Sequence, residues 1–276
     1  MSAAGAHPAT GAGAGPTAPG AGGRRAAQAA AAAGRLSERV IWHELECGRY
    51  AADLGVWRRL ARRAGGPVLD VGAGSGRVAL ALAGDGHEVT AVDVDGELLA
   101  RLSQRARSQG LTVRTLIADA RRLALAERFS LCVVPMQTIQ LLGGARARAR
   151  FLRAAAGLLL PGGLLGMAIV EHVEAFDARE GAAAPAPDAG EHDGVLYLSR
   201  PVAVRVLADS ILLERVRERV QESGGVAVAE DRVKLARVSA AELERECAAA
   251  GLRAVERIAV PQTDEHAPST VVVARG

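Results

Sequence analysis

The sequence predicts an α/β protein built on a doubly wound, mostly parallel sheet, and two observations support this prediction. Short apolar segments alternate with segments of about 10–15 residues in which apolar side chains recur at helical spacing. Strands that alternate with such helices form a parallel sheet, and fully apolar strands indicate that both faces are covered. The second observation is a turn with Gly72, Gly74 and Gly76 directly after the first apolar segment. Such a turn joins a buried strand to a helix and lets backbone N–H groups approach a ligand.

The boundaries of the elements follow from the same patterns. Two short N-terminal helices are expected, because apolar side chains recur at helical spacing up to the stop signal Gly65-Gly66-Pro67. These helices cover residues 37–47 and 50–64. The predicted strands are 68–71, 87–93, 112–117, 129–134 and 164–170. The predicted helices between them are 78–83, 97–108 and 145–159, the last of which ends before the turn Pro161-Gly162-Gly163.

Composition limits the class of protein. The chain has 276 residues, of which 49% are hydrophobic, enough for one large, well-filled domain. Residues 1–35 are rich in Ala, Gly and Pro and are expected to be a disordered tail. The net charge of +3 is small and arginine supplies almost all positive charge, so no nucleic-acid partner is expected. No apolar run approaches the ~18 residues of a membrane span, so no membrane partner is expected.

The three cysteines are Cys47, Cys132 and Cys247, far apart and without a C-x-x-C pair. Neither a disulfide framework nor a metal site is expected from this spacing. Free thiols fit a reducing compartment, which predicts a cytoplasmic protein.

Three aspartates stand where successive predicted strands end: Asp70, Asp93 and Asp119. The carboxyl ends of parallel strands form one edge of the sheet, where ligands bind in doubly wound folds. An acid ending the second strand, about 20 residues after the glycines, is placed to accept hydrogen bonds from a ribose. Each aspartate could also simply cap a helix or a turn.

The glycine spacing disfavours a dinucleotide. In the pattern G-x-G-x-x-G/A counted from Gly72, the final small residue would be Arg77. The chain also lacks a Tyr-x-x-x-Lys pair, since Lys234 is its only lysine. An NAD(P)-dependent oxidoreductase is therefore the less favoured alternative.

Five segments, residues 68–76, 89–95, 118–120, 129–135 and 159–163, resemble the successive motifs of class I S-adenosylmethionine-dependent methyltransferases. The resemblance resumes over residues 237–274, where Ser239 and Glu242 form a capping box that opens a helix ending at Gly251. It implies a seven-stranded Rossmann-like methyltransferase sheet, completed by strands 252–260 and 270–274, and S-adenosyl-L-methionine as cofactor.

The resemblance also implies which residues bind this cofactor. Gly72, Ala73 and Gly74 would approach its methionine portion, and Asp70 and Gly76, on either side of them, would also contact the cofactor. Asp93 would hold the ribose and Val94 would flank the adenine. The remaining implied contacts are Asp119 and Ala120 at the adenine edge, Val134 and Pro135 around the methyl donor, and Tyr50 as an aromatic lid. Tyr50 could instead be a tyrosine packed at the edge of the sheet.

The resemblance further implies how the chain is divided. Residues 36–173 would be the cofactor-binding core with its N-terminal helices, 174–193 a loop and 237–276 the completion of the core. Residues 194–236 would be an antiparallel β insertion that either covers the substrate or pairs two subunits of a homodimer. Within it, residues 195–206 and 226–235 look like strands, whereas 211–220 also fits a helix. In a strand, Arg215, Arg217 and Arg219 would share a face that either binds an anion or is solvated.

Methyl transfer from a sulfonium needs mainly a nucleophile held in line about 3 Å from the methyl carbon, with water excluded. No catalytic residue is therefore obligatory. Glu171, His172 and His43 are candidates for a base or a substrate anchor, although a histidine at the sheet edge can also serve structure alone.

The methyl acceptor is expected to be a small molecule, methylated on nitrogen or oxygen. At the end of the fourth strand, Val134-Pro135-Met136-Gln137 replaces the Asn/Asp-Pro-Pro-aromatic motif of DNA amino-methyltransferases. Aromatic residues that could stack on RNA bases are few. A non-catalytic S-adenosylmethionine-binding or regulatory protein remains an alternative.

Overall fold

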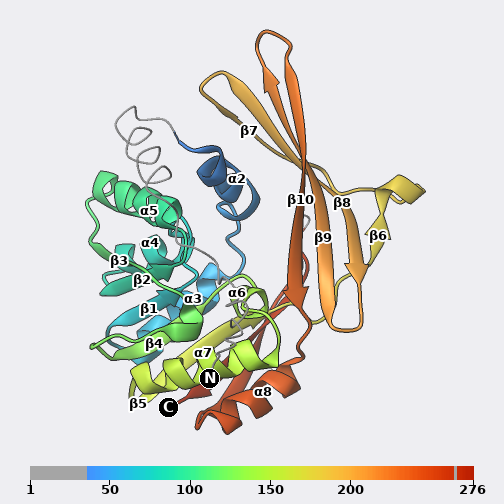
Figure 1. Ribbon diagram of the computed structural model, residues 1–276. Helices are drawn as coiled ribbons and strands as arrows, with labels where there is room; N and C mark the ends of the chain where they lie inside the picture. Colours follow the sequence, from blue (N-terminus) through green and yellow to red (C-terminus); the bar gives the residue numbers. More distant parts are fainter. Residues whose placement is uncertain (1–35, 264–265) are drawn as a thin grey trace, which may run out of the picture. The chain divides into compact units, whose positions relative to one another are not determined.

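The computed structural model describes residues 36–263 and 266–276, and the chain from Glu38 onward forms one compact unit. The expected tail over residues 1–35 lies outside the described residues. Sheet A has seven strands in the order β11-β12-β5-β4-β1-β2-β3 (Figure 1). Strands β1 to β5 are parallel, and β12 is antiparallel to both of its neighbours. The predicted doubly wound, mostly parallel seven-stranded sheet is thus confirmed. The strand bounds are β1 Val68–Val71, β2 Val89–Asp93, β3 Val113–Ile117, β4 Phe129–Val134, β5 Leu159–Ile169, β11 Arg253–Val260 and β12 Ser269–Arg275.

Helices pack on both faces of sheet A, which explains why its central strands β1 and β4 are almost entirely buried. On one face, α3, α4 and α5 contribute Trp57, Leu82 and Leu102 to a buried cluster. On the other face, α7 and α8 contribute Phe151 and Leu243 to a second cluster. The predicted capping box opens α8. The helix bounds are α3 Leu54–Ala64, α4 Arg77–Gly84, α5 Gly96–Ser108, α6 Thr138–Leu141, α7 Ala145–Leu158 and α8 Ala240–Ala249.

The antiparallel insertion forms a second sheet, sheet B, in which β10, β9, β8 and β6 follow one another and β7 also pairs with β8. The ambiguous segment 211–220 is a strand, because β9 pairs along its whole length with both β8 and β10. Pro201 is tolerated inside β8 at a register irregularity. The bounds in sheet B are β6 Phe176–Asp177, β7 Asp188–His192, β8 Val195–Val206, β9 Ser210–Gln221 and β10 Val226–Ala236.

Three sequence predictions need correction. The segment 174–193, expected to be a loop, contains β6 and β7, which the composition hides because β7 is polar. Residues 50–53 are not helical, since α3 begins at Leu54. The turn expected at Pro161-Gly162-Gly163 lies inside β5, whose first residues pair with Phe129 before the register shifts.

Helix α2 (Glu38–Cys47) is held between the two sheets by charged side chains. On the sheet B side, Glu46 accepts hydrogen bonds of 2.8 Å from Nε and Nη2 of Arg217 and one of 3.2 Å from Arg215. On the side of α5, Arg101 donates to both carboxylate oxygens of Glu44 at 2.9 and 3.2 Å. The arginine face of β9 therefore binds carboxylates of this chain, with Arg219 pairing with Glu38. Because Arg215 and Arg217 are mostly buried, the prediction of a solvated face is wrong for these two arginines.

Sheet B is also joined to sheet A through Gln140 of α6, which is fully buried. Its Nε2 donates to the carbonyls of Val170 and Ala236, each at 3.1 Å, and its Oε1 accepts from the amide of Val170 at 2.8 Å. This side chain satisfies backbone groups just after β5 and at the end of β10. It thereby fixes the segment that follows β4 against both sheets.

Candidate functional site

The glycine turn after β1 is closely packed by side chains of this chain. Gly72, Gly74 and Gly76 have φ values of +72°, +54° and +93°, a conformation that favours glycine. A Cβ atom would lie 2.4 Å from the Thr138 side chain at Gly72, 2.4 Å from His43 at Gly74 and 2.5 Å from Leu102 at Gly76. The turn is therefore shaped as much by its neighbours in the fold as by any ligand.

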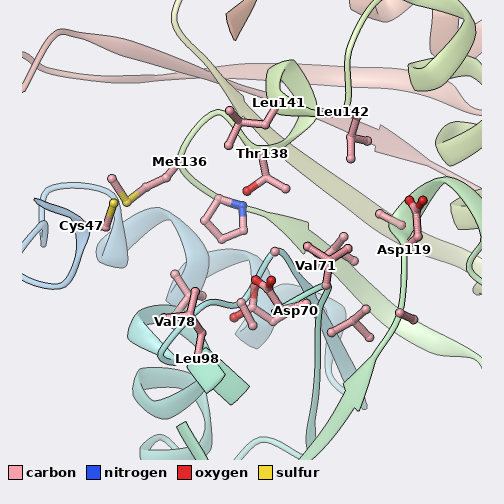
Figure 2. Close-up of a pocket in the computed structure, with 18 of the residues that line it drawn as sticks. Cys47, Asp70, Val71, Val78, Leu98, Asp119, Met136, Thr138, Leu141 and Leu142 are labelled. Carbon is pink, nitrogen blue, oxygen red and sulfur yellow. The ribbon is translucent and has the colours of Figure 1, made fainter. Parts of the chain in front are cut away.

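A cavity of about 410 Å³ lies beside this turn at the carboxyl ends of β1, β2 and β4, a volume typical of small-ligand sites (Figure 2). It is lined by eight residues implied for the cofactor, namely Asp70, Gly72, Ala73, Asp93, Val94, Asp119, Ala120 and Pro135, and by His43. The three aspartates thus meet in one cavity, as the strand order predicts. Four other implied residues, Gly74, Gly76, Val134 and Tyr50, do not line it.

Asp93 holds the turn in place. Its Oδ2 accepts the amide of Gly74 at 2.8 Å and its Oδ1 accepts the amide of Asp95 at 2.9 Å. Each carboxylate oxygen keeps a second lone pair. Asp93 can therefore support the turn and still accept hydrogen bonds from two ribose hydroxyls.

Asp119 is engaged by a neighbour two residues away. Nε of Arg121 is 2.9 and 3.1 Å from the two carboxylate oxygens, and Nη2 is 2.7 Å from Oδ2. These hydrogen bonds lower the pKa of Asp119. The carboxylate is thereby kept ionised, and an adenine amino group would share it with Arg121.

Asp70 is fully buried, and neither of its carboxylate oxygens has a hydrogen-bond partner of normal geometry among the described residues. Burial raises its pKa to about 7, an effect that Arg77 and the backbone amide of Ala79 only partly offset. Buried polar atoms normally have partners. An unpartnered carboxylate that lines a cavity fits a ligand carrying a positive charge, such as the ammonium group of a methionine moiety.

Tyr50, implied as an aromatic lid, does not line this cavity. It is buried between Arg77, whose guanidinium lies 5.1 Å from the ring centroid, and His266, whose ring centroid is 4.5 Å away. Its backbone carbonyl accepts a hydrogen bond of 2.9 Å from Arg77. The alternative role, a tyrosine packed in the structure, is the one that the geometry favours.

Glu171 and His172 line a different cavity, of about 270 Å³, at the start of α8. Oε1 of Glu171 accepts the amide of Ala240 at 2.8 Å, so this carboxylate caps α8. His172 is exposed. Neither residue lines the cavity that contains the three aspartates, and of the three candidate catalytic residues only His43 does.

His43 projects from α2 toward the glycine turn. Its Nδ1 is 3.5 Å from Oγ of Ser75. Burial lowers the pKa of His43, although the acids Asp93, Glu44, Asp95 and Glu46 oppose this effect. The imidazole is therefore neutral at pH 7.

Sequence reasoning missed the wall of the cavity formed by the segment after β4. In Figure 2 this wall includes Met136, Thr138, Leu141 and Leu142, with Cys47 of α2 beside it. Met136 and Gln137 both have positive φ, +45° and +58°, which is uncommon for residues with side chains and often marks functional sites. The signal in the sequence was the position of this segment, directly after a strand at the ligand-binding edge.

Comparisons with known proteins agree with this geometry. The sequence profile described as "Methyltransferase domain" matches residues 68–163, which run from β1 into β5. No curated protein matches the chain. Among solved structures, the CcbJ methyltransferase from Streptomyces caelestis is 26% identical, with a TM-score of 0.61 over 82% of this chain and 90% of that one.

Two further solved structures have lower sequence identities, so their similarity to this chain is a similarity of fold alone. The sugar N-methyltransferase KedS8 from Streptoalloteichus sp. is 18% identical, with a TM-score of 0.66 over 99% of this chain and 98% of its own. CalS10, an amino pentose methyltransferase from Micromonospora echinaspora, is also 18% identical, with a TM-score of 0.65 over 87% of this chain and 98% of its own. The matched domain and the similarity to CcbJ support a class I S-adenosylmethionine-dependent methyltransferase, and the two further structures show the same fold.

Proposed function

We propose that this enzyme methylates a nitrogen or an oxygen of a small molecule bound beside the cofactor in the 410 Å³ cavity. One observation carries the proposal: beyond the residues suited to the cofactor, the cavity has a wall of uncharged side chains after β4. This wall consists of Met136, Thr138, Leu141 and Leu142. Such a wall can bury part of a small acceptor and exclude water from the reaction.

The residues that would hold the cofactor are those that the sequence implied and that line the cavity. Asp93 would accept hydrogen bonds from the ribose, Val94 would flank the adenine, and Asp119 and Ala120 would contact the adenine edge. Asp70 would receive the ammonium group, since its buried oxygens have no partner of normal geometry among the described residues. When bound, S-adenosylmethionine supplies an activated methyl group that needs no further activation by the protein.

Positioning would do most of the catalytic work. The chain would hold the acceptor in line with the methyl group, which can replace much of the entropic cost of a bimolecular reaction. Glu171 and His172 line the other cavity and have no part in this mechanism. A neutral amine can attack with its own lone pair and needs no base in the transfer step, so nitrogen is the acceptor that the site suits better. The fold shared with an amino pentose methyltransferase and a sugar N-methyltransferase supports the same choice.

We also propose that the enzyme works in the cytoplasm and as a homodimer. Cys132 and Cys247 are buried free thiols, which suit a reducing compartment. No helix in the described part of the chain is long and apolar enough to cross a membrane. Strand β10 is the edge of sheet B and exposes Val226 and Val228, features that favour pairing with a second copy. Sedimentation of the full chain tests this assembly, and a monomer at high concentration would contradict it.

Methyl transfer can be tested with the full chain, S-adenosylmethionine carrying a labelled methyl group, and matched pairs of small amines and alcohols, amino sugars included. The expected result is labelled product on the amine of at least one pair, with S-adenosylhomocysteine formed in equal amount. Binding of the cofactor without transfer to any acceptor would favour a non-catalytic role. Binding of NAD in place of S-adenosylmethionine would overturn the proposal.

A further inference from the structure

The amino-acid portion of S-adenosylmethionine has two charges, an ammonium group and a carboxylate, and each needs a polar partner in a cavity. Asp70 suits the ammonium group. The proposed function requires a partner for the carboxylate as well. Among the described residues, the cationic or imidazole side chains that line the cavity are His43, Arg77 and Arg121.

Arg77 and Arg121 are already committed to other groups. Arg77 donates to both oxygens of Asp53 and to the carbonyl of Tyr50, and its side chain is 9% exposed. Arg121 binds the carboxylate of Asp119, at the end of the cavity suited to the adenine. Both arginines are therefore already held by a carboxylate of this chain. His43 forms no such ion pair with any of the residues that the structure describes.

The position of His43 matches the position of the amino-acid portion. Its Nε2 lies against the glycine turn, since a Cβ on Gly74 would be only 2.4 Å away from it. The other ring nitrogen, Nδ1, faces the hydroxyl of Ser75 at 3.5 Å. With the hydroxyl as donor to Nδ1, the imidazole carries its proton on Nε2, which is then a donor beside the glycine turn.

We propose that Nε2–H of His43 donates a hydrogen bond to the carboxylate of the methionine portion, while Asp70 receives its ammonium group. The inference rests on the proposed function, because it assigns residues to the cofactor of that same cavity. It makes α2 part of the cofactor site: Glu46, three residues after His43, binds Arg217 of β9. The position of the imidazole is therefore linked to sheet B.

The test compares three ligands by isothermal titration calorimetry. S-adenosylhomocysteine has both charges, its decarboxylated analogue has only the ammonium group, and 5′-methylthioadenosine has neither. The variants are His43→Leu, which removes the donor, His43→Gln, which can restore one, and His87→Leu as the matched control. His87 precedes β2 and does not line the cavity.

His43→Leu should weaken S-adenosylhomocysteine about 10- to 100-fold, the range expected for one hydrogen bond to a charged group. It should leave the other two ligands within about twofold of the wild type, and His43→Gln should recover part of the loss. The control should bind all three ligands normally. Equal losses for all three ligands would assign His43 a purely structural role, and no loss for S-adenosylhomocysteine would overturn the inference directly. If the wild-type protein binds none of the ligands, the proposed function itself fails.

Discussion

Arg77 and Asp53 form a nearly buried ion pair in which Nη1 and Nη2 of the guanidinium lie 2.5 and 2.9 Å from the two carboxylate oxygens. Only 9% and 2% of the two side chains is exposed. Nε1 of Trp57 also donates to Asp53, at 2.8 Å. Arg77 can therefore be the first residue of α4, at a position where a dinucleotide-binding turn needs a small residue. Its long side chain is accommodated because it pairs with Asp53, just before α3.

The first prediction concerns this pair. Arg77→Met should lower the free energy of unfolding by about 3–5 kcal/mol, because it leaves Asp53 charged and buried with only the Trp57 hydrogen bond. The double variant Asp53→Asn/Arg77→Met should recover much of the loss, since no uncompensated charge remains. Urea denaturation of the three proteins measures both effects. Additive losses in the double variant would contradict the coupling.

The second prediction concerns Asp93. Asp93→Ala should weaken binding of S-adenosylmethionine by about 1.5–3 kcal/mol, because a charged acceptor for the ribose is lost. The variant also loses the hydrogen bonds to the amides of Gly74 and Asp95, so a ligand control is needed. The 2′,3′-dideoxy analogue of S-adenosylhomocysteine should bind the wild type and the variant with similar affinity. An unchanged affinity for S-adenosylmethionine would refute the assigned pose.

The third prediction concerns Asp70 and pH. Its pKa is raised from 3.8 to about 7, so the folded protein binds a proton more tightly than the unfolded chain does. The stability that this group contributes is complete below about pH 4 and is lost as the pH rises through 7. Asp70→Asn should remove this dependence and raise the free energy of unfolding at pH 8 by about 1–3 kcal/mol.

The same variant should bind S-adenosylmethionine more weakly, because a neutral amide cannot replace a carboxylate as partner of the ammonium group. Thermal unfolding at pH 5 and pH 8, without ligand, tests the stability effect, and calorimetry tests the binding effect. If Asp70→Asn keeps the pH dependence of the wild type, another group is responsible.

The fourth prediction concerns the attachment of α2. Burial alone would raise the pKa of Glu46, but Arg217, Arg215 and Ser199 outweigh burial and lower it. Glu46→Gln removes this charge and leaves two partly buried arginines with less compensation. Hydrogen exchange of residues 38–47 should become faster, while β1 and β4 keep their protection. The exposed pair of Arg114 and Glu127 offers a control, since Glu127→Gln should leave α2 unchanged.

The sequence by itself determined the doubly wound sheet and the edge at which the site lies. Apolar strands and helical spacing depend on local chemistry, and the order of parallel strands places Asp70, Asp93 and Asp119 at a common edge. The capping box at Ser239 was equally local, because its two partners are three residues apart. Segment 211–220 stayed ambiguous because its spacing satisfied both periods, and pairing with two neighbouring strands settled it.

Only the tertiary structure decided which side chains meet in the cavity. The sequence offered Glu171 as a stronger candidate than His43, but Glu171 caps α8 whereas His43 reaches the glycine turn from α2. The arginines of β9 pair with Glu38 and Glu46, which lie about 170–180 residues away in the chain. No local sequence pattern encodes this pairing. Periodicity specifies which face of an element is buried, but contacts between distant side chains depend on how the elements pack, and packing brings this cavity together.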